Sequence, residues 1–161
     1  MRVGIGHDTH RLEPGRPMIL GGVTIECDRG PVGHSDADVL LHAVTDALFG
    51  AGGLGDIGGW FPDDDPAFAG ADSSAFVTTA RDELKSRGWS VANLDCTVFA
   101  ETPRVGPVAA EIRGRIAELL ELPPDAVNVK AKSGEGVGPI GRGEAIAAQV
   151  VVLIERSDQS H

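Results

Sequence analysis

The chain has 161 residues, of which 42% are hydrophobic and 24% are charged. This length and composition indicate one folded domain with a hydrophobic core and exclude a disordered chain. The formal net charge is −10, and no cluster of Lys or Arg offsets it locally, which disfavours nucleic acid and membrane surfaces as partners. Glycine, with 22 residues, is about twice as frequent as usual, so we expect backbone groups to make many ligand contacts.

The two cysteines, Cys27 and Cys96, lie far apart and form no Cys-x-x-Cys pair. The sequence therefore supports neither a disulfide framework nor a thiolate zinc site, and we expect two reduced thiols. No leader with a basic start and an apolar centre is present, and no apolar run approaches the roughly 18 residues that span a bilayer. These features predict a cytoplasmic protein.

The first half of the chain alternates between extended and helical patterns. Apolar residues predict strands at 1–6 and 18–25, joined by a turn-rich loop. A helix is predicted over 36–49, with Ser35 as its N-cap. In the glycine-rich stretch 50–71, hydrophobic residues recur with neither a helical nor a strand period, which predicts a long irregular segment. Such segments are often functional.

The second half supplies two more helices and three strands. The patterns predict helices over 73–88 and 105–120 and strands over 90–101, 127–132 and 144–155. Helices interleaved with strands indicate an α/β domain whose sheet is covered by helices on at least one face. We expect residues 1–156 to form a single domain and residues 157–161 to form a disordered tail.

A candidate metal site comes from three residues of the first half. Asp8 and His10 are two apart on an extended segment, so their side chains project to the same side, and His42 lies on the helix that follows. One carboxylate and two imidazoles suit a zinc-like ion with a fourth position left open. Asp38 and Asp46 lie one turn before and after His42, where either could accept its other ring proton. Chance occurrence of Asp-x-His and solvated carboxylates remain the alternative.

Three further segments are candidates for binding phosphate or metal. His34 and Ser35 precede the 36–49 helix, whose positive end favours anions, although plain capping is the alternative. The acidic run 63–65 suits an ion site or a solvated turn. Glu101 to Arg104 lie between the end of a predicted strand and the start of a predicted helix, where α/β sheets commonly bind ligands. Arg104 is a candidate phosphate contact.

The loop 133–143 contains Gly136-x-Gly138-x-x-Gly141, which formally matches the dinucleotide-binding fingerprint. We reject that interpretation because the fingerprint needs a helix after the glycines, whereas a β-branched strand follows here. Amides and cations of this loop remain candidates for lining a phosphate, and Glu135 is a candidate magnesium ligand. A simple strand connection is the alternative.

Four long segments together resemble one known family. They are Arg2 to His10, "GHSDADVLLHAVTDALFGAGGLGDIG" at 33–58, "FPDDDPAFAGADS" at 61–73 and "VNVKAKSGEGVGPIGRGEAIA" at 127–147. In this order they resemble the 2-C-methyl-D-erythritol 2,4-cyclodiphosphate synthases over almost the whole chain. The resemblance implies a single α/β domain with a mixed β-sheet, assembled as a homotrimer with active sites between neighbouring subunits.

The resemblance also implies a reaction and its metals. A cytidine diphosphate derivative of methylerythritol 2-phosphate cyclises in the methylerythritol phosphate route to isoprenoids, with loss of CMP. Zinc would be bound by Asp8, His10 and His42, and magnesium (or manganese) by Glu135, while His34 and Ser133 would be catalytic. The expected substrate-binding residues are Asp8, Thr9, His10, His34, Ser35, Asp56, Ile57, Gly58, Phe61, Pro62, Asp63, Asp64, Asp65, Ala100, Glu101, Thr102, Pro103, Arg104, Val105, Gly106, Lys132, Ser133, Gly134, Glu135 and Arg142.

The sequence departs from the family at three places. Lys132-Ser133-Gly134 replaces a Thr-rich stretch, so the transition-state hydroxyl would come from Ser133. His7 and Pro139 stand where relatives often carry Phe, which disfavours a family-like apolar channel on the trimer axis. Two other functions compete with the synthase: a metal-dependent phosphohydrolase, and a metal- or nucleotide-binding module without catalysis.

Overall fold

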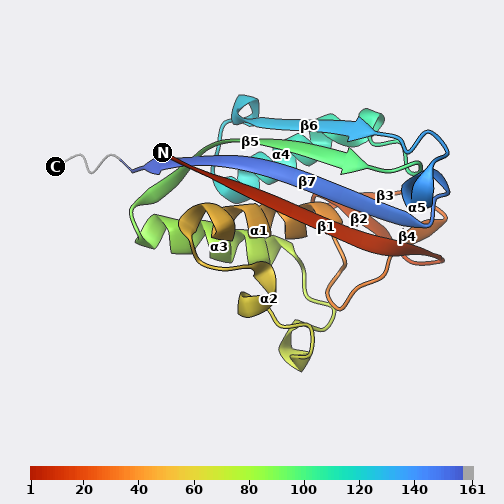
Figure 1. Ribbon diagram of the computed structural model, residues 1–161, viewed down its shortest axis with the longest axis horizontal. Helices are drawn as coiled ribbons and strands as arrows, with labels where there is room; N and C mark the ends of the chain where they lie inside the picture. Colours follow the sequence, from red (N-terminus) through yellow and green to blue (C-terminus); the bar gives the residue numbers. More distant parts are fainter. Residues whose placement is uncertain (158–161) are drawn as a thin grey trace.

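A five-stranded mixed sheet forms the centre of the fold (Figure 1). The structure is a computed structural model that describes residues 1–157. The strands lie in the order β4-β1-β7-β5-β6, and β5 and β6 are parallel whereas the other pairs are antiparallel. Their bounds are β1 Arg2–Pro14, β4 Arg29–Pro31, β5 Trp89–Phe99, β6 Val127–Lys132 and β7 Ala145–Arg156. The predicted mixed sheet is confirmed.

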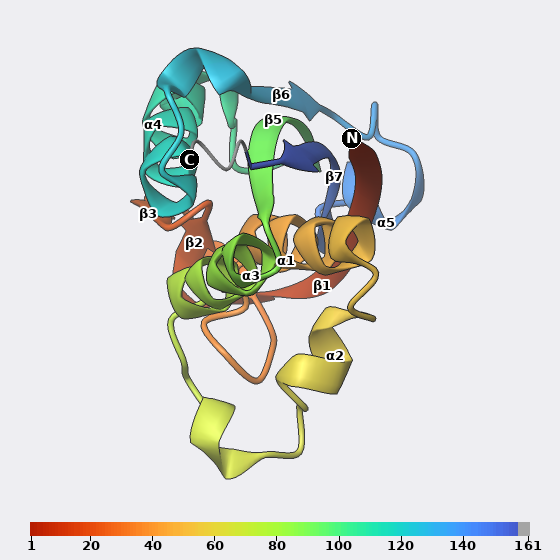
Figure 2. The same cartoon turned by 90° about the vertical axis from the view of Figure 1, so that its left-hand side faces the viewer.

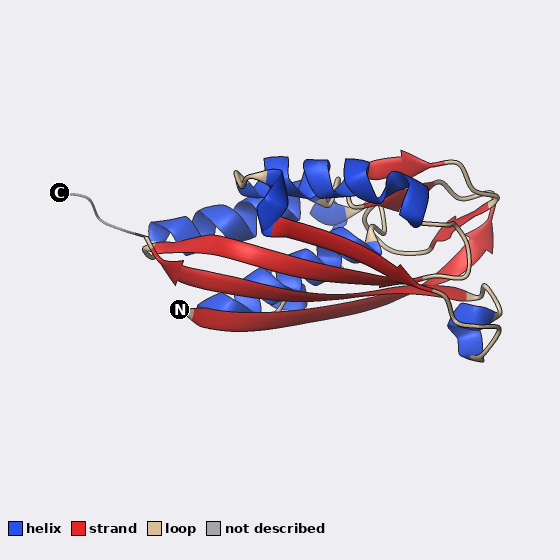
Figure 3. Ribbon diagram, turned by 90° about the horizontal axis from the view of Figure 1, so that it is seen from above, coloured by secondary structure: helices blue, strands red, loops and turns tan. Residues whose placement is uncertain are grey.

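Three long helices cover one face of this sheet (Figures 2 and 3). They are α1 Val39–Gly52, α3 Ser74–Ser86 and α4 Ala109–Leu120. Short helical turns connect the larger elements: α2 Ile57–Trp60, η1 Pro66–Phe68, η2 Gly106–Val108, η3 Pro124–Ala126 and α5 Gly138–Gly141. Among the described residues, no helix is both long and apolar enough to cross a membrane.

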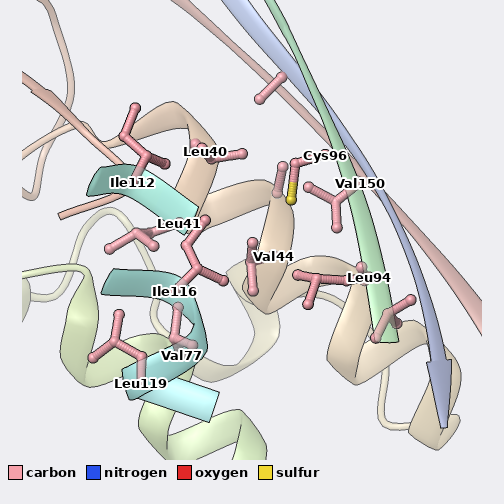
Figure 4. Close-up of a cluster of buried hydrophobic side chains, with 14 of the residues drawn as sticks. Leu40, Leu41, Val44, Val77, Leu94, Cys96, Ile112, Ile116, Leu119 and Val150 are labelled. Carbon is pink, nitrogen blue, oxygen red and sulfur yellow. The ribbon is translucent and has the colours of Figure 1, made fainter. Parts of the chain in front are cut away.

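The hydrophobic core lies between the helices and the covered face of the sheet (Figure 4). Leu41 and Val44 of α1 and Ile116 of α4 are buried against inward-facing strand residues such as Cys96 and Val150. The alternation predicted for β5 is confirmed, because Leu94, Cys96 and Val98 are buried whereas the residues between them are more accessible. Both cysteines are free thiols.

Two glycines allow α1 to lie directly on β1. A side chain at Gly4 would place its Cβ 2.0 Å from the Ala47 carbonyl oxygen, and one at Gly6 would place it 1.9 Å from the Ala43 carbonyl oxygen. Only glycine permits so close an approach of two backbones. The helix and the strand are therefore held in contact next to Asp8, where we expect the metal site.

Several element boundaries differ from the predictions. The strand predicted at 1–6 continues to Pro14 as β1, so most of the loop expected after it is strand. The predicted strand at 18–25 is a hairpin of β2 Met18–Leu20 and β3 Val23–Ile25, because Gly21 and Gly22 adopt positive φ and turn the chain. The predicted helix at 36–49 begins only at Val39, because Ala37 has a φ of 60° and Asp38, not Ser35, is the N-cap.

The irregular segment predicted at 50–71 projects from the body of the protein (Figure 2). It contains α2 and η1, and its aromatic residues tie it to the helices. Trp60 stacks on Phe49 of α1, and Phe61 stacks on Phe76 of α3 with ring centroids 4.2 Å apart. The segment is therefore anchored at its base.

Of the predicted tail 157–161, the structure describes only the first residue. The Ser157 amide donates a hydrogen bond to the Gly88 carbonyl, so residue 157 still belongs to the folded body. The rest of the predicted tail, 158–161, lies outside the described residues.

Candidate functional site

The structure brings the three predicted metal ligands together where α1 packs against β1. The Asp8 Oδ2 atom lies 2.9 Å from His10 Nε2 and 2.9 Å from His42 Nδ1. The two imidazole nitrogens are 3.2 Å apart. Three donor atoms that converge so closely from two elements fit a single divalent ion.

The outer ring nitrogens of both histidines are also hydrogen-bonded. His10 Nδ1 lies 2.8 Å from the Val32 carbonyl, to which it donates, so its Nε2 lone pair is free for a metal. His42 Nε2 lies 3.0 Å from Ser35 Oγ and 2.9 Å from Ser73 Oγ. Imidazoles that are fixed in this way through their second nitrogen are typical of metal ligands. The residues present therefore fit a zinc-like ion.

The ligand cluster shifts the pKa values of its own groups. Burial alone would raise the pKa of Asp8, but hydrogen bonds from His10 and His42 outweigh it and hold that pKa well below its ordinary value of 3.8. For His10, burial opposes the shift, yet the bond to the Asp8 carboxylate raises its pKa above 6.5. Without a metal, Asp8 and His10 thus favour a carboxylate–imidazolium pair.

This pair predicts a pH dependence for the metal-free protein. Because the pKa of Asp8 is lowered on folding, its carboxylate contributes to the folding stability above pH 3.8. Because the pKa of His10 is raised, its imidazolium contributes fully below pH 6.5, and this contribution is lost as the pH rises through the pKa of the folded state. When a chelator keeps the protein free of metal, Asp8→Asn is expected to lower the free energy of unfolding more at about pH 6 than at about pH 9. Denaturant titrations at both pH values measure it. An equal loss at the two values would contradict the charged pair.

A cavity of about 340 Å³ opens beside this cluster. It is lined by nine residues predicted for metal or substrate, namely Asp8, His10, His34, Ser35, His42, Ile57, Gly58, Phe61 and Asp63. Val32, Gly33, Phe68 and Phe76 complete the lining. The cavity therefore combines a polar floor, formed by the ligand cluster, with an apolar side formed by aromatic rings.

The projecting segment closes one side of the cavity. His34 Nε2 donates to the Asp65 backbone oxygen at 3.0 Å, and the Gly70 amide donates to the His34 carbonyl at 2.8 Å. Phe68 and Phe76, which the sequence analysis did not propose as site residues, line the cavity with their rings 6.0 Å apart. Phe76 has helical core spacing, so its sequence gave no sign that its ring also reaches a cavity.

A second group of predicted residues gathers at the ends of β5 and β6. The Ala100 amide donates to the Lys132 carbonyl at 3.0 Å, and the Gly134 amide donates to Glu101 Oε2 at 3.1 Å. These contacts join the predicted segments 100–106 and 132–135. Among the described residues, none of the two segments lines the cavity at Asp8. The predicted site is thus divided into two groups within one chain.

Glu135 has an unusual backbone conformation within this second group. Its φ of 49° lies in the left-handed region, which is costly for a residue with a side chain. The Ser133 hydroxyl donates to Glu135 Oε1 at 2.9 Å, and the Glu135 amide returns a longer bond to Ser133 Oγ. Strain of this kind is common at functional sites. The two predicted functional residues are therefore in direct contact.

Several details of the predicted site are wrong. Neither Asp38 nor Asp46 contacts the His42 ring: Asp38 accepts the amides of Gly21, Gly22, Leu40 and Leu41, and Asp46 accepts the amide of Ile57. Burial raises the pKa of Asp38 to about 6. The Thr9 hydroxyl lies beside His7 on the other face of β1, away from the cavity. The partner expected for Asp38 and Asp46 is wrong because amides of other segments, those of Gly21, Gly22 and Ile57, bind these carboxylates. The assignment of Thr9 to the substrate stays a prediction.

Arg142 is already engaged within its own loop. Its guanidinium donates to both carboxylate oxygens of Glu144, at 2.8 and 2.9 Å. This pairing raises the pKa of Arg142 and lowers that of Glu144. The loop contains one helix that was not predicted, α5, but it has only four residues and ends at Gly141. The strand β7 follows it, so the rejection of a dinucleotide fingerprint is consistent with the structure.

Known proteins match the chain in sequence and in fold. The YgbB family profile matches residues 1–155. The 2-C-methyl-D-erythritol 2,4-cyclodiphosphate synthase of Bordetella pertussis is 56% identical over 156 residues, which are 97% of this chain and 96% of that protein.

Two solved structures extend this likeness. The CDP-bound form of a 2C-methyl-D-erythritol-2,4-cyclodiphosphate synthase has a TM-score of 0.89 and 37% identity, over 96% of this chain and 100% of that one. The bifunctional IspDF from Campylobacter jejuni has a TM-score of 0.95 and 38% identity over 99% of this chain, which spans 43% of that larger protein. The profile match over nearly the full length shows that this chain belongs to the YgbB family.

Proposed function

We propose that this protein is a phosphorus–oxygen lyase of isoprenoid biosynthesis. It converts 4-diphosphocytidyl-2-C-methyl-D-erythritol 2-phosphate into 2-C-methyl-D-erythritol 2,4-cyclodiphosphate and CMP. The observation that carries the proposal is the cluster of Asp8, His10 and His42 at the floor of a cavity beside His34. The cited relatives match 96% to 97% of this chain, and their names support the same reaction.

Two metal sites follow from the donor groups. Asp8, His10 and His42 would hold zinc, because two imidazoles and one carboxylate suit that ion. Glu135 would hold magnesium, which prefers carboxylate and phosphate oxygens. When bound, the two ions would supply charge neutralisation for the phosphates of the substrate. On a protein with a net charge of −10, such local compensation is needed for an anionic substrate.

The reaction needs positioning more than a strong base. An oxygen of the 2-phosphate forms a bond to the β-phosphorus, and the bond from that phosphorus to the bridging oxygen breaks, so CMP leaves with that oxygen. The nucleophile is tethered to its target, so holding both phosphates in line accounts for much of the acceleration. His34 and Ser133 would donate hydrogen bonds to the phosphoryl oxygens on which negative charge develops.

The cavity would hold the methylerythritol part of the substrate. Ile57, Gly58, Phe61 and Asp63 form its projecting side, and Phe68 and Phe76 add apolar surface. Aromatic walls exclude water, which would otherwise hydrolyse the activated phosphate. The segments 100–106 and 132–135 would hold the cytidine and its phosphates, and the CDP-bound relatives support a nucleotide ligand.

A homotrimer would unite the two groups of site residues. Within one chain the segments 100–106 and 132–135 do not reach the described cavity, so a second subunit would supply them. The uncovered face of the sheet offers an interface, since Val3 and Ile5 of β1 are 66% and 59% exposed, and Ile5 pairs with exposed Val151 of β7. A native mass measurement at working concentration tests this assembly, and a monomer with full activity would contradict it. The cytoplasmic location stays a prediction.

One product analysis separates the synthase from its competitors. Purified protein with zinc and magnesium should convert the cytidylated substrate into CMP and the cyclic diphosphate in equal amounts. A phosphohydrolase would release linear products or free phosphate, and a binding module would bind cytidine nucleotides without turnover. Exclusively linear products would overturn the proposal.

Ser133→Ala tests the hydroxyl in the second group. We expect kcat to fall by an amount equivalent to about 2 to 4 kcal/mol of barrier, as for the loss of an oxyanion-hole donor. The metal content at the Asp8 cluster should not change, because Ser133 contacts Glu135 instead. Steady-state kinetics with metal analysis measures both. Unchanged kcat would remove Ser133 from the catalytic residues.

A further inference from the structure

The environment of His42 Nε2 points to two residues beyond the proposed metal ligands. This nitrogen faces away from Asp8 and lies 2.9 Å from Ser73 Oγ, at the start of α3. Ser73 is fully buried, and its hydroxyl also contacts the Asp36 carboxylate. His42, Ser73 and Asp36 therefore form a continuous chain of contacts from the ligand cluster into the protein.

The direction of the hydrogen bonds in this chain follows from the chemistry of its groups. A carboxylate only accepts, so the Ser73 hydroxyl donates its proton to Asp36. The Ser73 oxygen then keeps its lone pairs for a donor, and that donor is the His42 Nε2–H. When a metal ion replaces the proton that His42 Nδ1 shares with Asp8, a neutral imidazole with its remaining proton on Nε2 offers the Nδ1 lone pair to that ion.

Asp36 is itself held in place by other donors. Its carboxylate accepts the Ser73 amide at 3.0 Å and the Asp38 amide at 3.2 Å. Its own amide donates to the Ala71 carbonyl at 3.0 Å. The carboxylate thus connects the segment before α1 to the segment before α3, and its position is fixed without any contribution from His42.

Ser35 is the competing partner of His42. Its Oγ lies 3.0 Å from His42 Nε2, but it accepts the Ala37 amide and its own proton has no carboxylate to receive it in the described contacts. Ser35 also lines the cavity and is one of the residues expected to bind the substrate. The serine whose proton is committed to a carboxylate is the better acceptor for an imidazole N–H.

We propose that Ser73 and Asp36 are positioning residues for His42: Asp36 orients the Ser73 hydroxyl, which fixes the ring so that Nδ1 points to the metal. The inference rests on the proposed metal site and deepens it. An alternative role for Ser73 is helix capping, yet its side chain makes no capping bond within α3. Capping therefore does not account for the buried hydroxyl.

Zinc affinity of the full-length protein, measured by chelator competition without substrate, tests the proposal. Ser73→Ala is expected to weaken zinc binding about 10- to 100-fold, as for other outer partners of metal-bound histidines. Asp36→Asn keeps an oxygen for Ser73 but loses the charge, so its effect should be smaller. Ser73→Thr keeps the hydroxyl and should restore affinity. Ser74→Ala, at the next position of α3, is the matched control and should bind zinc as the wild type does.

Two further measurements separate positioning from a purely structural role. The visible spectrum of bound cobalt(II) should change in Ser73→Ala but not in Ser74→Ala, because only the first alters a ligand's orientation. Turnover of Ser73→Ala should fall at limiting zinc and recover with excess zinc. A lower melting temperature with unchanged zinc affinity and cobalt spectrum would overturn the proposal. If the wild type binds zinc but makes no cyclic product, the proposed reaction fails while the positioning role stands.

Discussion

Replacing His42 with alanine is expected to remove the zinc and to slow turnover by on the order of a thousandfold, because a metal ion contributes several kcal/mol of charge stabilisation. His42 supplies one of three ligand atoms, and its Nδ1 lies 2.9 Å from Asp8 Oδ2. The remaining Asp8 and His10 cannot hold a zinc-like ion with the same affinity. Metal analysis of the purified variant and steady-state kinetics measure the two effects.

The fold should survive this change. Alanine has the highest helix propensity, and α1 is held by many other buried side chains. His7→Ala is a matched control, because His7 is an exposed histidine of the same strand as Asp8 and contacts Thr9 on the opposite face. The control should keep its metal. Full turnover by a zinc-free His42→Ala protein would contradict the role of the cluster.

The ligand cluster itself was predictable from the sequence, whereas its surroundings were not. Residues two apart on a strand share a face, so Asp8 and His10 had to project together. That His42 joins them depends on α1 lying across β1, which periodicity alone does not specify. The residue types alone made His42 a candidate third ligand, the family resemblance supported it, and the structure places the three side chains together.

The hydrogen-bond partners of the cluster depend on contacts between distant segments. Asp38 has helical spacing to His42, but the amides of Gly21 and Gly22, from the turn between β2 and β3, bind its carboxylate instead. Ser73 reaches His42 across 31 residues of sequence. A serine before a helix is ordinarily interpreted as a cap, so its sequence context gave no signal for this contact.

The start of α1 is a second place where a local sequence pattern does not predict the structure. Ser35 with Asp38 three residues later fits the pattern of a helix start, yet Ala37 adopts a φ of 60°. This conformation is unfavourable for alanine and is not expected from sequence. It turns the chain so that Asp38 caps the helix while Ser35 Oγ faces His42. Tertiary contacts therefore override the local capping signal at the residues nearest to the cavity.

Gly6→Ala is expected to destabilise the protein by about 3 kcal/mol or more and to weaken zinc binding as well, because overpacking against backbone forces the elements apart. The new Cβ would lie 1.9 Å from the Ala43 carbonyl oxygen and 2.7 Å from the Ala47 amide nitrogen. Both atoms belong to the backbone of α1 and cannot rotate away. The helix must therefore move away from β1, and His42 moves with it relative to Asp8.

Gly50→Ala is the matched control for this substitution. Gly50 lies in the same helix and faces the same strand, but its added Cβ would meet only the Ile5 carbonyl oxygen, at 3.8 Å. This distance is an ordinary contact, and alanine in place of a helical glycine is expected to stabilise by up to about 1 kcal/mol. Denaturant unfolding and chelator competition on both variants compare the two positions. Loss of stability in Gly6→Ala with unchanged zinc affinity would show that the ligand cluster tolerates movement of α1, and that the close approach of the two backbones serves the fold alone.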